Sequence, residues 1–440
     1  MRSIGIGLAG LGNVGGEVAR LLLAHREEFR RRLGAELRLA AVCDRRAPSR
    51  ARRLRLPGSV KLKRRWQDLL RERSVEVVIE LFGGAGPARE LVLGALASGR
   101  HVVTANKMLL SRHWDEVFRA ARRNNRQVFF EASVAGGIPI LQAVREGLAA
   151  NRIRSVLGIF NGTTNFILSE MARCGRTMAE ALREAQRLGL AEKDPSLDLS
   201  GGDTAHKLSV IASLLAGRRF PAERIPCEGI ERISPDDLRF AAAHLGRTVR
   251  LLGTLNLDWA SDPVRSEAHV HPTLVPLQHP LANVHGSYNA VLVDTSSAGD
   301  LMFYGQGAGP GPAASAVLGD LLQVGRELLA ASGREAARPR AALPSRPLSP
   351  APESDAAFYL RLHLSDRPGV LAQVAGALGE RGISIAQIHQ DVPGASPRGG
   401  KGVPVMIVTH SAPAAAIRRA AAAIERLPAS AGRPVCLRML

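Results

Sequence analysis

Hydrophobic runs in the first 130 residues alternate with patterns of helical period. The runs predict strands at residues 4–9, 37–43, 75–81, 101–104 and 128–131. The helical patterns lie at residues 14–23 and 88–97. Because strands that alternate with helices are typical of βαβ units, we expect a parallel sheet with covering helices in residues 1–133.

The pattern changes between residues 134 and 331. Longer helical segments lie at residues 177–189 and 204–216. Apolar runs that resemble antiparallel strands lie at residues 251–257, 264–270 and 291–294. This mixture predicts a second unit, of the α+β class.

The C-terminal residues predict a third, small unit. Apolar and polar side chains alternate over residues 358–364, which indicates a strand. After a DRPG turn at residues 366–369, the predicted elements are a helix at 370–380, strands at 383–388 and 403–409, a helix at 414–427 and a strand at 435–440. The order βαββαβ predicts a ferredoxin-like fold over residues 357–440. The proline-rich composition of residues 332–356 predicts a linker that lets this unit move.

Length and composition exclude several classes of protein. A chain of 440 residues accommodates about three domains, and 45% hydrophobic residues suffice for a buried core. The four cysteines form no CxxC pair, which argues against a disulfide scaffold and a cysteine–zinc cluster. The sequence contains no apolar stretch of about 18 residues and no signal-peptide cleavage pattern. We therefore expect a cytoplasmic protein without membrane contact.

The chain is strongly basic, with a net charge of +19. Only six of its 59 basic residues are lysine, which leaves 53 arginines. A nucleic-acid binder, retained on DNA at low salt, is one interpretation of this charge. Aromatic residues make up only 4%, and no basic stretch alternates with aromatics as a single-strand-binding surface does. We therefore favour a solvated or phosphate-steering surface, densest at residues 45–73, and expect no nucleic-acid partner.

A glycine-rich loop follows the first predicted strand and opens the first predicted helix. Its sequence, GLGNVG, spans residues 10–15. Glycines let the chain turn tightly and bring backbone N–H groups close to a pyrophosphate at a helix N-terminus. This placement favours a dinucleotide site over a simple tight turn. The predicted contact residues are Gly10, Gly12, Asn13, Val14 and Gly15.

The second predicted strand ends in a carboxylate and two arginines. Asp44 lies where a dinucleotide-binding unit places an acid against the ribose hydroxyls. Arg45, directly after it, either pairs with a 2′-phosphate or is surface charge. The arginines favour NADP as the cofactor, with NAD as the alternative.

Six motifs then follow in order along the chain. They are FGG at 82–84, VTANK at 103–107, EASVAGGIP at 131–139, NGTTN at 161–165, AEKDP at 191–195 and DLSGGDTAHK at 198–207. Together they resemble the homoserine dehydrogenase family, and the resemblance covers residues 3–330. The C-terminal unit, with its DRPG turn, resembles an ACT domain, which many members of that family carry.

The resemblance implies a fold and an activity. The fold is an α/β protein with a Rossmann-type nucleotide-binding domain at residues 1–133 and a catalytic and dimerisation domain at residues 134–331. The chain is expected to return to the nucleotide-binding domain near residues 305–330. The activity is the NAD(P)-dependent interconversion of L-homoserine and L-aspartate 4-semialdehyde in threonine and methionine biosynthesis.

Regulation and assembly are also implied. A homo-oligomer, either a dimer or a tetramer, is expected, with feedback by an amino-acid effector, for which threonine is the leading choice. The helix after the DRPG turn begins with N–H groups at Val370 and Leu371 that can hold a carboxylate. The alternative is an ACT domain that serves for dimerisation without a ligand.

The last of the six motifs suits the reduction of an aldehyde. Hydride transfer leaves an alkoxide, which needs a positioned proton donor. Asp203 and Lys207 lie four residues apart on one helix face, either as a catalytic pair or as an ordinary ion pair. Lysine can release a proton where arginine cannot, and Lys107 and Lys207 are two of only six lysines. We predict all three as catalytic residues and leave open which lysine dominates proton transfer.

The resemblance assigns further residues to the substrate and the cofactor. Glu192 and Asp198 supply carboxylates where the family binds the substrate's ammonium group. Gly162 and Thr163 offer N–H and hydroxyl donors to its carboxylate. The residues expected at the cofactor, besides the glycine loop, are Thr104, Lys107 and Gly307.

The turn at residues 131–139 resembles the family's site for a monovalent cation. The predicted ligands are Glu131 and the backbone carbonyls of Val134, Gly136 and Ile138. One carboxylate with carbonyls suits a weakly bound hard ion such as sodium, not a transition metal. A plain glycine-rich loop is the alternative.

Two further functions compete with the leading one. Another NAD(P)-dependent amino-acid dehydrogenase could share the nucleotide domain, but the motif that carries Asp203 and Lys207 argues against it. A catalytically silent amino-acid sensor would keep the ACT-like unit and would not need Lys107, Asp203 and Lys207 intact.

Overall fold

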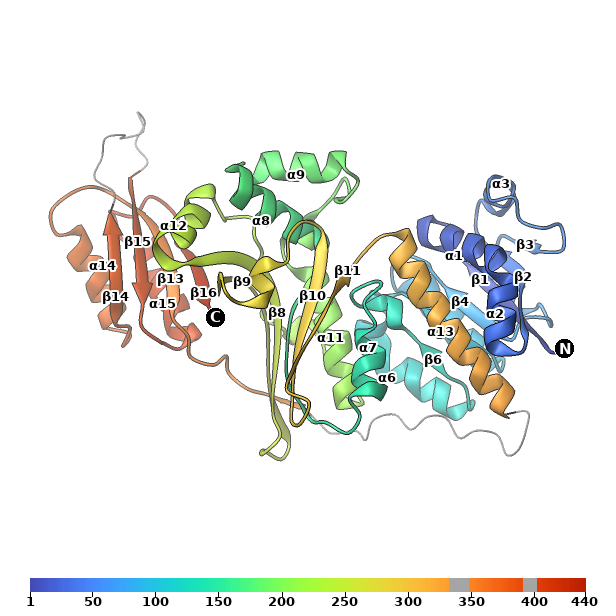
Figure 1. Cartoon of the computed structure of the whole chain (residues 1–440). Coiled ribbons are helices and arrows are strands. Elements are labelled where there is room, and N and C mark those ends of the chain that lie inside the picture. Colours follow the sequence, from blue (N-terminus) through green and yellow to red (C-terminus); the bar gives the residue numbers. More distant parts are fainter. Residues whose placement is uncertain (332–347, 391–401) are drawn as a thin grey trace.

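The computed structural model describes residues 1–331, 348–390 and 402–440. Figure 1 shows three units in a row. The N-terminal unit holds residues 1–133 and the late helix α13, the central unit holds residues 134–306, and the C-terminal unit holds residues 357–440. None of the helices in the described ranges is both long and apolar enough to cross a membrane.

The N-terminal unit is a six-stranded parallel sheet in the order β3-β2-β1-β4-β5-β6. Its strands are β1 (Ser3–Ala9), β2 (Glu36–Cys43), β3 (Lys61–Lys63), β4 (Val77–Glu80), β5 (His101–Thr104) and β6 (Val128–Phe129). Its helices are α1 (Asn13–Ala24), α2 (Arg26–Leu33), α3 (Ala47–Arg53), α4 (Trp66–Leu70), α5 (Gly86–Ala97) and α6 (Lys107–Arg123), followed by the short turn η1 (Glu131–Ser133). The predicted Rossmann-type sheet is confirmed. The predictions omitted β3, whose sequence KLK carries no apolar run.

The chain returns to this unit after the central one. Helix α13 (Pro310–Ala331) lies beside α1 in Figure 1. Val317 and Leu321 of α13 are fully buried in the same core as Ile4 and Ile6 of β1. Burial of these apolar side chains ties the end of the central unit to the nucleotide sheet.

The central unit is built on long antiparallel strands. They are β7 (Ile153–Ile159), β8 (Arg247–Asp258), β9 (Val264–Pro276), β10 (Tyr288–Thr295) and β11 (Asp300–Gln306). The helices are α7 (Ile140–Gln142), α8 (Gly162–Cys174), α9 (Met178–Arg187), α10 (Ser196–Leu199), α11 (Gly202–Ala216) and α12 (Pro235–Leu245). The short helical turns η2 (Ala143–Gly147), η3 (Ala222–Arg224) and η4 (Pro280–Asn283) complete the unit. Helix α11 is buried over most of its length and brings Asp203 into the interior.

The C-terminal unit has the predicted βαββαβ order. Its elements are β13 (Phe358–Leu364), α14 (Val370–Gly379), β14 (Ile385–Gln390), β15 (Val403–Thr409), α15 (Ala414–Glu425) and β16 (Val435–Met439). The strands pair in the order β16-β13-β15-β14, and apolar residues of both helices pack with them in one core. The ferredoxin-like fold is therefore confirmed.

The predicted linker and the predicted mobility of this unit need correction. Residues 332–347 lie outside the described residues, but 348–350 form a strand, β12 (Leu348–Pro350), which pairs in parallel with β9. Strand β16 also pairs in parallel with β9, so the central and C-terminal strands form one continuous sheet. Strand pairing with the central unit overrides the linker-like composition, and the C-terminal unit is docked.

A fully buried carboxylate strengthens this docking. Asp237 of α12 accepts hydrogen bonds from the Tyr359 hydroxyl at 2.8 Å and from the Arg361 Nε at 2.7 Å. Both donors belong to β13 of the C-terminal unit. A buried ion pair with its hydrogen bonds satisfied holds two elements in one register.

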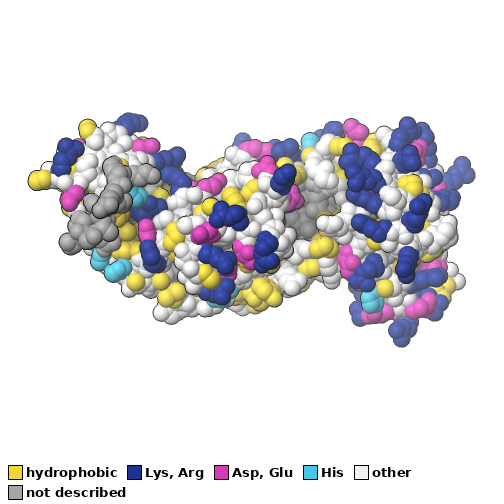
Figure 2. Space-filling model, turned by 90° about the horizontal axis from the view of Figure 1, so that it is seen from above, with side chains coloured by type: hydrophobic (Ala, Val, Ile, Leu, Met, Phe, Trp, Pro, Cys, Tyr) yellow, Lys and Arg dark blue, Asp and Glu magenta, His cyan; other side chains and the backbone are white. Residues whose placement is uncertain are grey.

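The positive charge is unevenly spread. Figure 2 shows Lys and Arg side chains gathered most densely over the N-terminal unit. Exposed arginines at the carboxyl end of β2, Arg45 and Arg46, contribute to it. On the face that Figure 2 shows, the positive charge thus lies mainly over the unit that carries the glycine-rich loop.

Candidate active site

The glycine-rich loop connects β1 to α1 as predicted. Gly10 has a φ of +97°, and a Cβ there would lie 2.6 Å from the Leu81 carbonyl oxygen. A Cβ on Gly15 would lie 1.8 Å from the Gly10 carbonyl oxygen, so the helix packs directly on the loop. By contrast, apart from the adjoining residues of the chain, no described atom lies within 4 Å of a Cβ built on Gly12. The loop is closely packed behind and open in front of the α1 N-terminus.

Asp44 lies beside this loop but is already engaged. Its carboxylate accepts from the Leu11 N–H at 2.9 Å and from Arg50 Nη1 at 2.5 Å. Burial alone would raise the pKa of Asp44, but these donors and the Arg46 N–H hold it below its usual value. Arg50 was not singled out from the sequence, whereas Arg45 is exposed, with no partner in the described part of the chain.

A buried network at the ends of β4 and β5 was also not predicted. Glu80 accepts from the Thr104 hydroxyl at 2.6 Å and from the Phe82 N–H at 2.6 Å. The Asn106 amide nitrogen donates to the Gly84 carbonyl oxygen at 2.7 Å, and its side-chain oxygen caps α6. Burial raises the pKa of Glu80 to about 7. The Thr104 hydroxyl, expected at the cofactor, is therefore used inside the protein to fix the start of α6.

Helix α6 begins with Lys107, whose ammonium group reaches Asp203 of the central unit. Lys107 Nζ lies 2.9 Å from Asp203 Oδ1, and Lys207 Nζ lies 2.8 Å from Asp203 Oδ2. The side chains of Asp203, Lys207 and Lys107 are 5%, 12% and 31% exposed. The three predicted catalytic residues thus form one cluster at the boundary of two units, and Lys107 is the most accessible.

The surroundings of the cluster decide its charge. Burial opposes ionisation of Asp203, but the two lysines hold the pKa of its carboxyl well below the usual range. Burial lowers the pKa of Lys107, yet Asp203, together with Asp198 and Glu192, more than offsets this, and the pKa lies above its ordinary value. Two ammonium groups therefore share one carboxylate, and the cluster has a net positive charge.

The segment between strand β7 and helix α8 supplies the residues that contact the cluster next. Lys207 Nζ donates to the Phe160 carbonyl oxygen at 2.6 Å. The Asn161 side-chain amide donates to Asp203 at 2.8 Å and to Asp198 at 2.7 Å, and its oxygen caps α8. Burial and the nearby Asp203 raise the pKa of Asp198. Asn161, which the sequence analysis did not single out, joins the two acids.

The predicted substrate residues lie around this cluster. Gly162 and Thr163 are the first two residues of α8, so their N–H groups have no acceptor within the helix. The Thr163 hydroxyl donates instead to the Leu190 carbonyl oxygen, at 2.7 Å. Glu192 is exposed, and its charge contributes to raising the pKa of Lys107.

The turn at residues 131–139 contains one buried acid and packs against a second. Glu131 accepts from the N–H groups of Leu141 at 2.9 Å and Gln142 at 2.7 Å, and therefore caps α7. Its own N–H donates to Asp320 of α13 at 2.8 Å. Burial raises the pKa of Glu131 to about 7 and that of Asp320 to about 8. Asp320 was not foreseen, because it lies far away in the sequence.

The backbone carbonyl groups of this turn differ in whether they accept a hydrogen bond. The Ile138 oxygen accepts from the Ile140 N–H at 2.8 Å, whereas those of Val134 and Gly136 accept no hydrogen bond from a described residue. A Cβ on Gly136 would lie 2.5 Å from the Gly307 carbonyl oxygen. Gly307 is buried and packs against this turn, which holds the segment after β11 in place. The described residues include no group of three or more His, Cys, Asp or Glu side chains placed for a metal ion.

Family models match three parts of the chain. The model described as "Homoserine dehydrogenase, NAD binding domain" matches residues 10–131, and "Homoserine dehydrogenase" matches residues 139–322. The ACT domain model matches residues 358–426. The matched parts follow the three units of the fold, except that the second model also includes the first part of α13, which packs on the N-terminal unit.

Curated relatives match the chain along nearly its whole length. A homoserine dehydrogenase of Neisseria gonorrhoeae is 41% identical over 436 residues, 97% of this chain and 96% of that protein. One of Pseudomonas aeruginosa is 41% identical over 444 residues, 100% of this chain and 99% of that protein. Both include the segment that the C-terminal unit occupies here.

Solved structures of homoserine dehydrogenases also resemble the chain in fold and sequence. A crystal structure of a homoserine dehydrogenase from Thiobacillus denitrificans has a TM-score of 0.88 and 40% identity, and covers 100% of this chain and 99% of that one. A hyperthermophilic archaeal homoserine dehydrogenase in complex with NADPH has a TM-score of 0.62 and 27% identity, over 73% of this chain and 97% of that one. The chain, with its nucleotide-binding, catalytic and ACT units, belongs to the homoserine dehydrogenase family of oxidoreductases.

Proposed function

We propose that the chain interconverts L-homoserine and L-aspartate 4-semialdehyde through the cluster of Lys107, Asp203 and Lys207, as a step toward threonine and methionine. The observation that carries this proposal is the pairing of one buried carboxylate with two lysines, at 2.9 Å and 2.8 Å. The cluster lies where the nucleotide-binding unit meets the central unit. A group at this boundary suits a reaction between a substrate bound at the central unit and a cofactor held by the glycine loop.

The chemistry of the cluster follows from its charge. The glycine-rich loop and the N-terminus of α1 would hold a nicotinamide dinucleotide, whose chemistry when bound would be hydride transfer to the aldehyde carbon of the semialdehyde. Negative charge would then develop on the aldehyde oxygen. A lysine ammonium group of the cluster stabilises this oxygen and gives it a proton, which yields the hydroxyl of homoserine. Asp203 holds both ammonium groups in place. In the oxidation direction the same lysine receives the hydroxyl proton.

The two lysines have different positions for this step. Lys207 also donates to the Phe160 carbonyl oxygen, so two of its hydrogen bonds are committed inside the protein. Lys107 is more exposed, and its pKa lies above the ordinary value. Both remain candidates for the proton donor.

Substrate binding is proposed around the start of α8. The N–H groups of Gly162 and Thr163 would bind the carboxylate, which suits the positive end of the helix dipole. Asp198 and Glu192 would bind the ammonium group. Because the Thr163 hydroxyl already donates to the Leu190 carbonyl oxygen, Thr163 would bind the substrate carboxylate through its backbone N–H.

For the cofactor we propose NADP, with NAD as the weaker alternative. The open space in front of Gly12 and the α1 N-terminus suits a pyrophosphate. Asp44 is paired with Arg50, whereas Arg45 is exposed and available for a 2′-phosphate. The archaeal relative in complex with NADPH agrees with this choice.

A monovalent cation, sodium, is proposed at the turn of residues 131–139. Two observations support it: the carbonyl groups of Val134 and Gly136 accept no hydrogen bond from a described residue, and Glu131 and Asp320 are buried acids, and oxygen ligands suit a hard ion. A cation there would favour the ionised form of Glu131, whose pKa burial raises. Its function would be to hold the turn against Gly307.

An amino-acid effector, threonine, is proposed at the start of α14, whose first residues are Val370 and Leu371. We also propose a homo-oligomer, dimer or tetramer, located in the cytoplasm. These proposals rest on the ACT domain and on the family, not on a contact within the chain.

The decisive experiment is steady-state reduction of L-aspartate 4-semialdehyde by the full chain, with NADPH and NADH compared side by side. We expect turnover with both and a lower KM for NADPH. Asp203→Asn should reduce turnover on the order of 10²-fold or more, because both lysines lose their carboxylate. A wild-type chain that reduces the semialdehyde with neither cofactor would contradict the proposal.

A further inference from the structure

Asn161 lies where strand β7 leads into helix α8, and it is 6% exposed. The residue before it, Phe160, accepts a hydrogen bond from Lys207 through its carbonyl oxygen, and the residue after it, Gly162, begins α8. A Cβ on Gly162 would lie 2.6 Å from the Ser287 carbonyl oxygen, so the chain is closely packed at this point. Asn161 is thus held between the cluster of lysines and aspartate and the start of α8.

The side-chain oxygen of Asn161 is committed to the helix. It accepts from the Thr164 N–H at 2.8 Å and from the Thr164 hydroxyl at 3.1 Å. The first of these bonds satisfies an N–H group that the first turn of a helix leaves without an acceptor. Because two donors hold the oxygen, the amide has one orientation, in which its nitrogen is directed to the acids.

The amide nitrogen joins two acids of like charge. It donates to Asp198 Oδ1 at 2.7 Å and to Asp203 Oδ2 at 2.8 Å. Burial and the charge of Asp203 raise the pKa of Asp198, whereas the bond from Asn161 and the charges of Lys207 and Lys107 lower it. One neutral amide with two N–H groups therefore keeps two carboxylates side by side and favours the ionised form of each.

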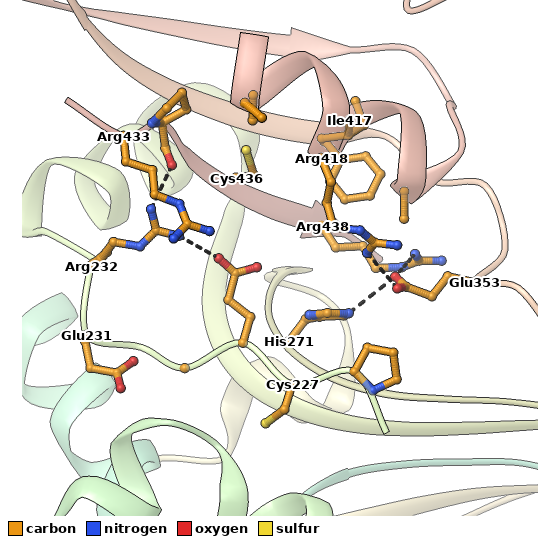
Figure 3. Close-up of a pocket in the computed structure, with 18 of the residues that line it drawn as sticks. Cys227, Glu231, Arg232, His271, Glu353, Ile417, Arg418, Arg433, Cys436 and Arg438 are labelled. Atoms are coloured by element: carbon orange, nitrogen blue, oxygen red, sulfur yellow. Dashed lines mark hydrogen bonds and ion pairs between the residues drawn. The ribbon is translucent and has the colours of Figure 1, made fainter. Parts of the chain in front are cut away.

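The backbone between the two acids is held by other contacts. The Ile230 N–H donates to the Leu199 carbonyl oxygen at 2.9 Å. Cys227 Sγ donates to the Ser200 carbonyl oxygen at 3.1 Å. Figure 3 shows Cys227 at the cavity of about 730 Å³ between the central and C-terminal units. The segment after α9 thus has its backbone fixed from residues 227–230, and Asn161 fixes its side-chain carboxylates.

Among residues that cap helices, asparagine alone can make both sets of contacts. Serine and threonine offer one hydroxyl proton, and an ionised aspartate offers none, whereas the asparagine amide has an acceptor and two N–H donors. We propose that Asn161 is a positioning residue for the dehydrogenase reaction, which holds the binding groups for the substrate at a fixed place relative to the lysines around Asp203. This inference rests on the proposed function, in which Asp198 binds the ammonium group and the start of α8 binds the carboxylate.

The test uses two variants that each keep an oxygen able to cap α8, Asn161→Ser and Asn161→Asp. The serine variant loses the bridge between the acids, and the aspartate variant puts a third carboxylate in its place. Both should lower kcat for reduction of the semialdehyde and raise its KM, with kcat/KM falling about 10- to 100-fold or more, as expected for lost hydrogen bonds to charged groups. The KM for NADPH should stay the same, because Asn161 contacts the substrate side. The melting temperature of Asn161→Ser should stay close to that of the wild type.

The pH dependence of substrate binding separates positioning from a general loss of structure. Isothermal titration calorimetry with L-homoserine, in the presence of NADPH so that no turnover occurs, gives the affinity between about pH 5 and 8. The ionised form of Asp198 is the one that would bind the ammonium group. Since the bond from Asn161 lowers the pKa of Asp198, its loss in Asn161→Ser should move the acidic limb of the binding curve to higher pH. Asn161→Asp should move this limb further, because of the added negative charge.

Thr177→Ser is the matched control. Thr177 caps α9, where its hydroxyl oxygen accepts from the Glu180 N–H at the exposed surface. This variant also changes a capping side chain, but at a helix whose cap bonds no acid of the cluster. It should leave kcat, both KM values and the acidic limb unchanged.

Three results would overturn the inference. Normal kcat and KM in Asn161→Ser would mean that Asn161 only caps α8, and reduced activity with an unmoved acidic limb would mean a general structural loss. The third is a wild type that does not bind L-homoserine. The turnover of the wild type tests the dehydrogenase function separately. A chain that binds L-homoserine and shows the shifted limb, but does not reduce the semialdehyde, would contradict the proposed function and leave the role of Asn161 in binding standing.

Discussion

Two buried aspartates of the central unit have closely similar positions but different partners. Asp203 and Asp237 each lie in the first turn of a helix, α11 and α12, and each accepts hydrogen bonds from another unit. Asp203 meets Lys107 at 2.9 Å, and Asp237 meets Arg361 at 2.7 Å. In both cases a cation from the other unit offsets the cost of burying the carboxylate.

The difference lies in what the cation can do. The lysines around Asp203 can exchange protons, and Lys107 is 31% exposed. Around Asp237, Arg361 is 11% exposed and remains protonated, while burial and Asp237 raise the pKa of Tyr359 far above its usual value. In the proposed mechanism, therefore, the same type of buried carboxylate serves chemistry at one place and docking at the other, according to the protonation chemistry and access of its partners.

The largest expected effect tests the chemical side of this comparison. Lys207→Arg keeps the positive charge beside Asp203 but removes a group that can release a proton. We expect turnover to fall by ~10²–10⁴ with little change in melting temperature. Steady-state kinetics measure the loss. Lys61→Arg, at an exposed ion pair with Glu72, is the control and should keep full activity. Near-normal kcat in Lys207→Arg would exclude it as the main proton donor.

The docking side is tested by Asp237→Asn. It leaves Arg361 buried without its counter-charge, which costs on the order of 3–5 kcal/mol when one partner of a buried pair is removed. Differential scanning calorimetry should show a lower melting temperature. Asp236→Asn, which affects the neighbouring exposed pair with Arg239, should change stability little. Equal melting temperatures for the two variants would mean that Asp237 does not hold the C-terminal unit.

A third buried carboxylate, Glu80 in the nucleotide-binding unit, has no cation among its hydrogen-bonding neighbours in the described ranges. Burial raises the pKa of Glu80 from 4.5 to about 7. Between these pH values the folded chain keeps a proton that the unfolded chain releases, so stability falls as the pH rises, by up to about 1.4 kcal/mol per pH unit. Glu80→Gln should therefore flatten the decline between about pH 5 and 7, measured by urea unfolding. The wild type and the Glu80→Gln variant share the contributions of Glu131 and Asp320, so the difference between their two slopes reports Glu80 alone. An identical slope would show that Glu80 is ionised in the folded chain.

The smallest effect is expected at the surface. Asp44 is neutralised by Arg50, which leaves Arg45 exposed. Arg45→Ala should raise the KM for NADPH about three- to tenfold and that for NADH less than about twofold, since an exposed pair contributes little. Arg53→Ala, another exposed arginine of the same region, is the control. Equal changes for both cofactors would show that Arg45 is surface charge only.

The sequence predicted the parts of the site that lie within one motif. The glycine loop, the pairing of Asp203 with Lys207 on one helix face, and the start of α8 all depend on short spacings. It did not predict Asn161 between the two acids, or Glu80 beneath the start of α6. Each of these contacts joins residues that are far apart in the chain, so no local pattern records it.

By itself, then, the sequence determined the alternation of strands and helices in residues 1–133, the glycine loop and the βαββαβ unit, because backbone periodicity and turn chemistry are local properties. Only the tertiary structure decided which polar groups remain available. It paired Asp44 with Arg50, used the Thr104 hydroxyl inside a buried network, and joined β16 to β9 where proline-rich composition had predicted a mobile tether. Hydrogen bonds and burial across distant segments make these choices, since they depend on which surfaces meet when the units pack.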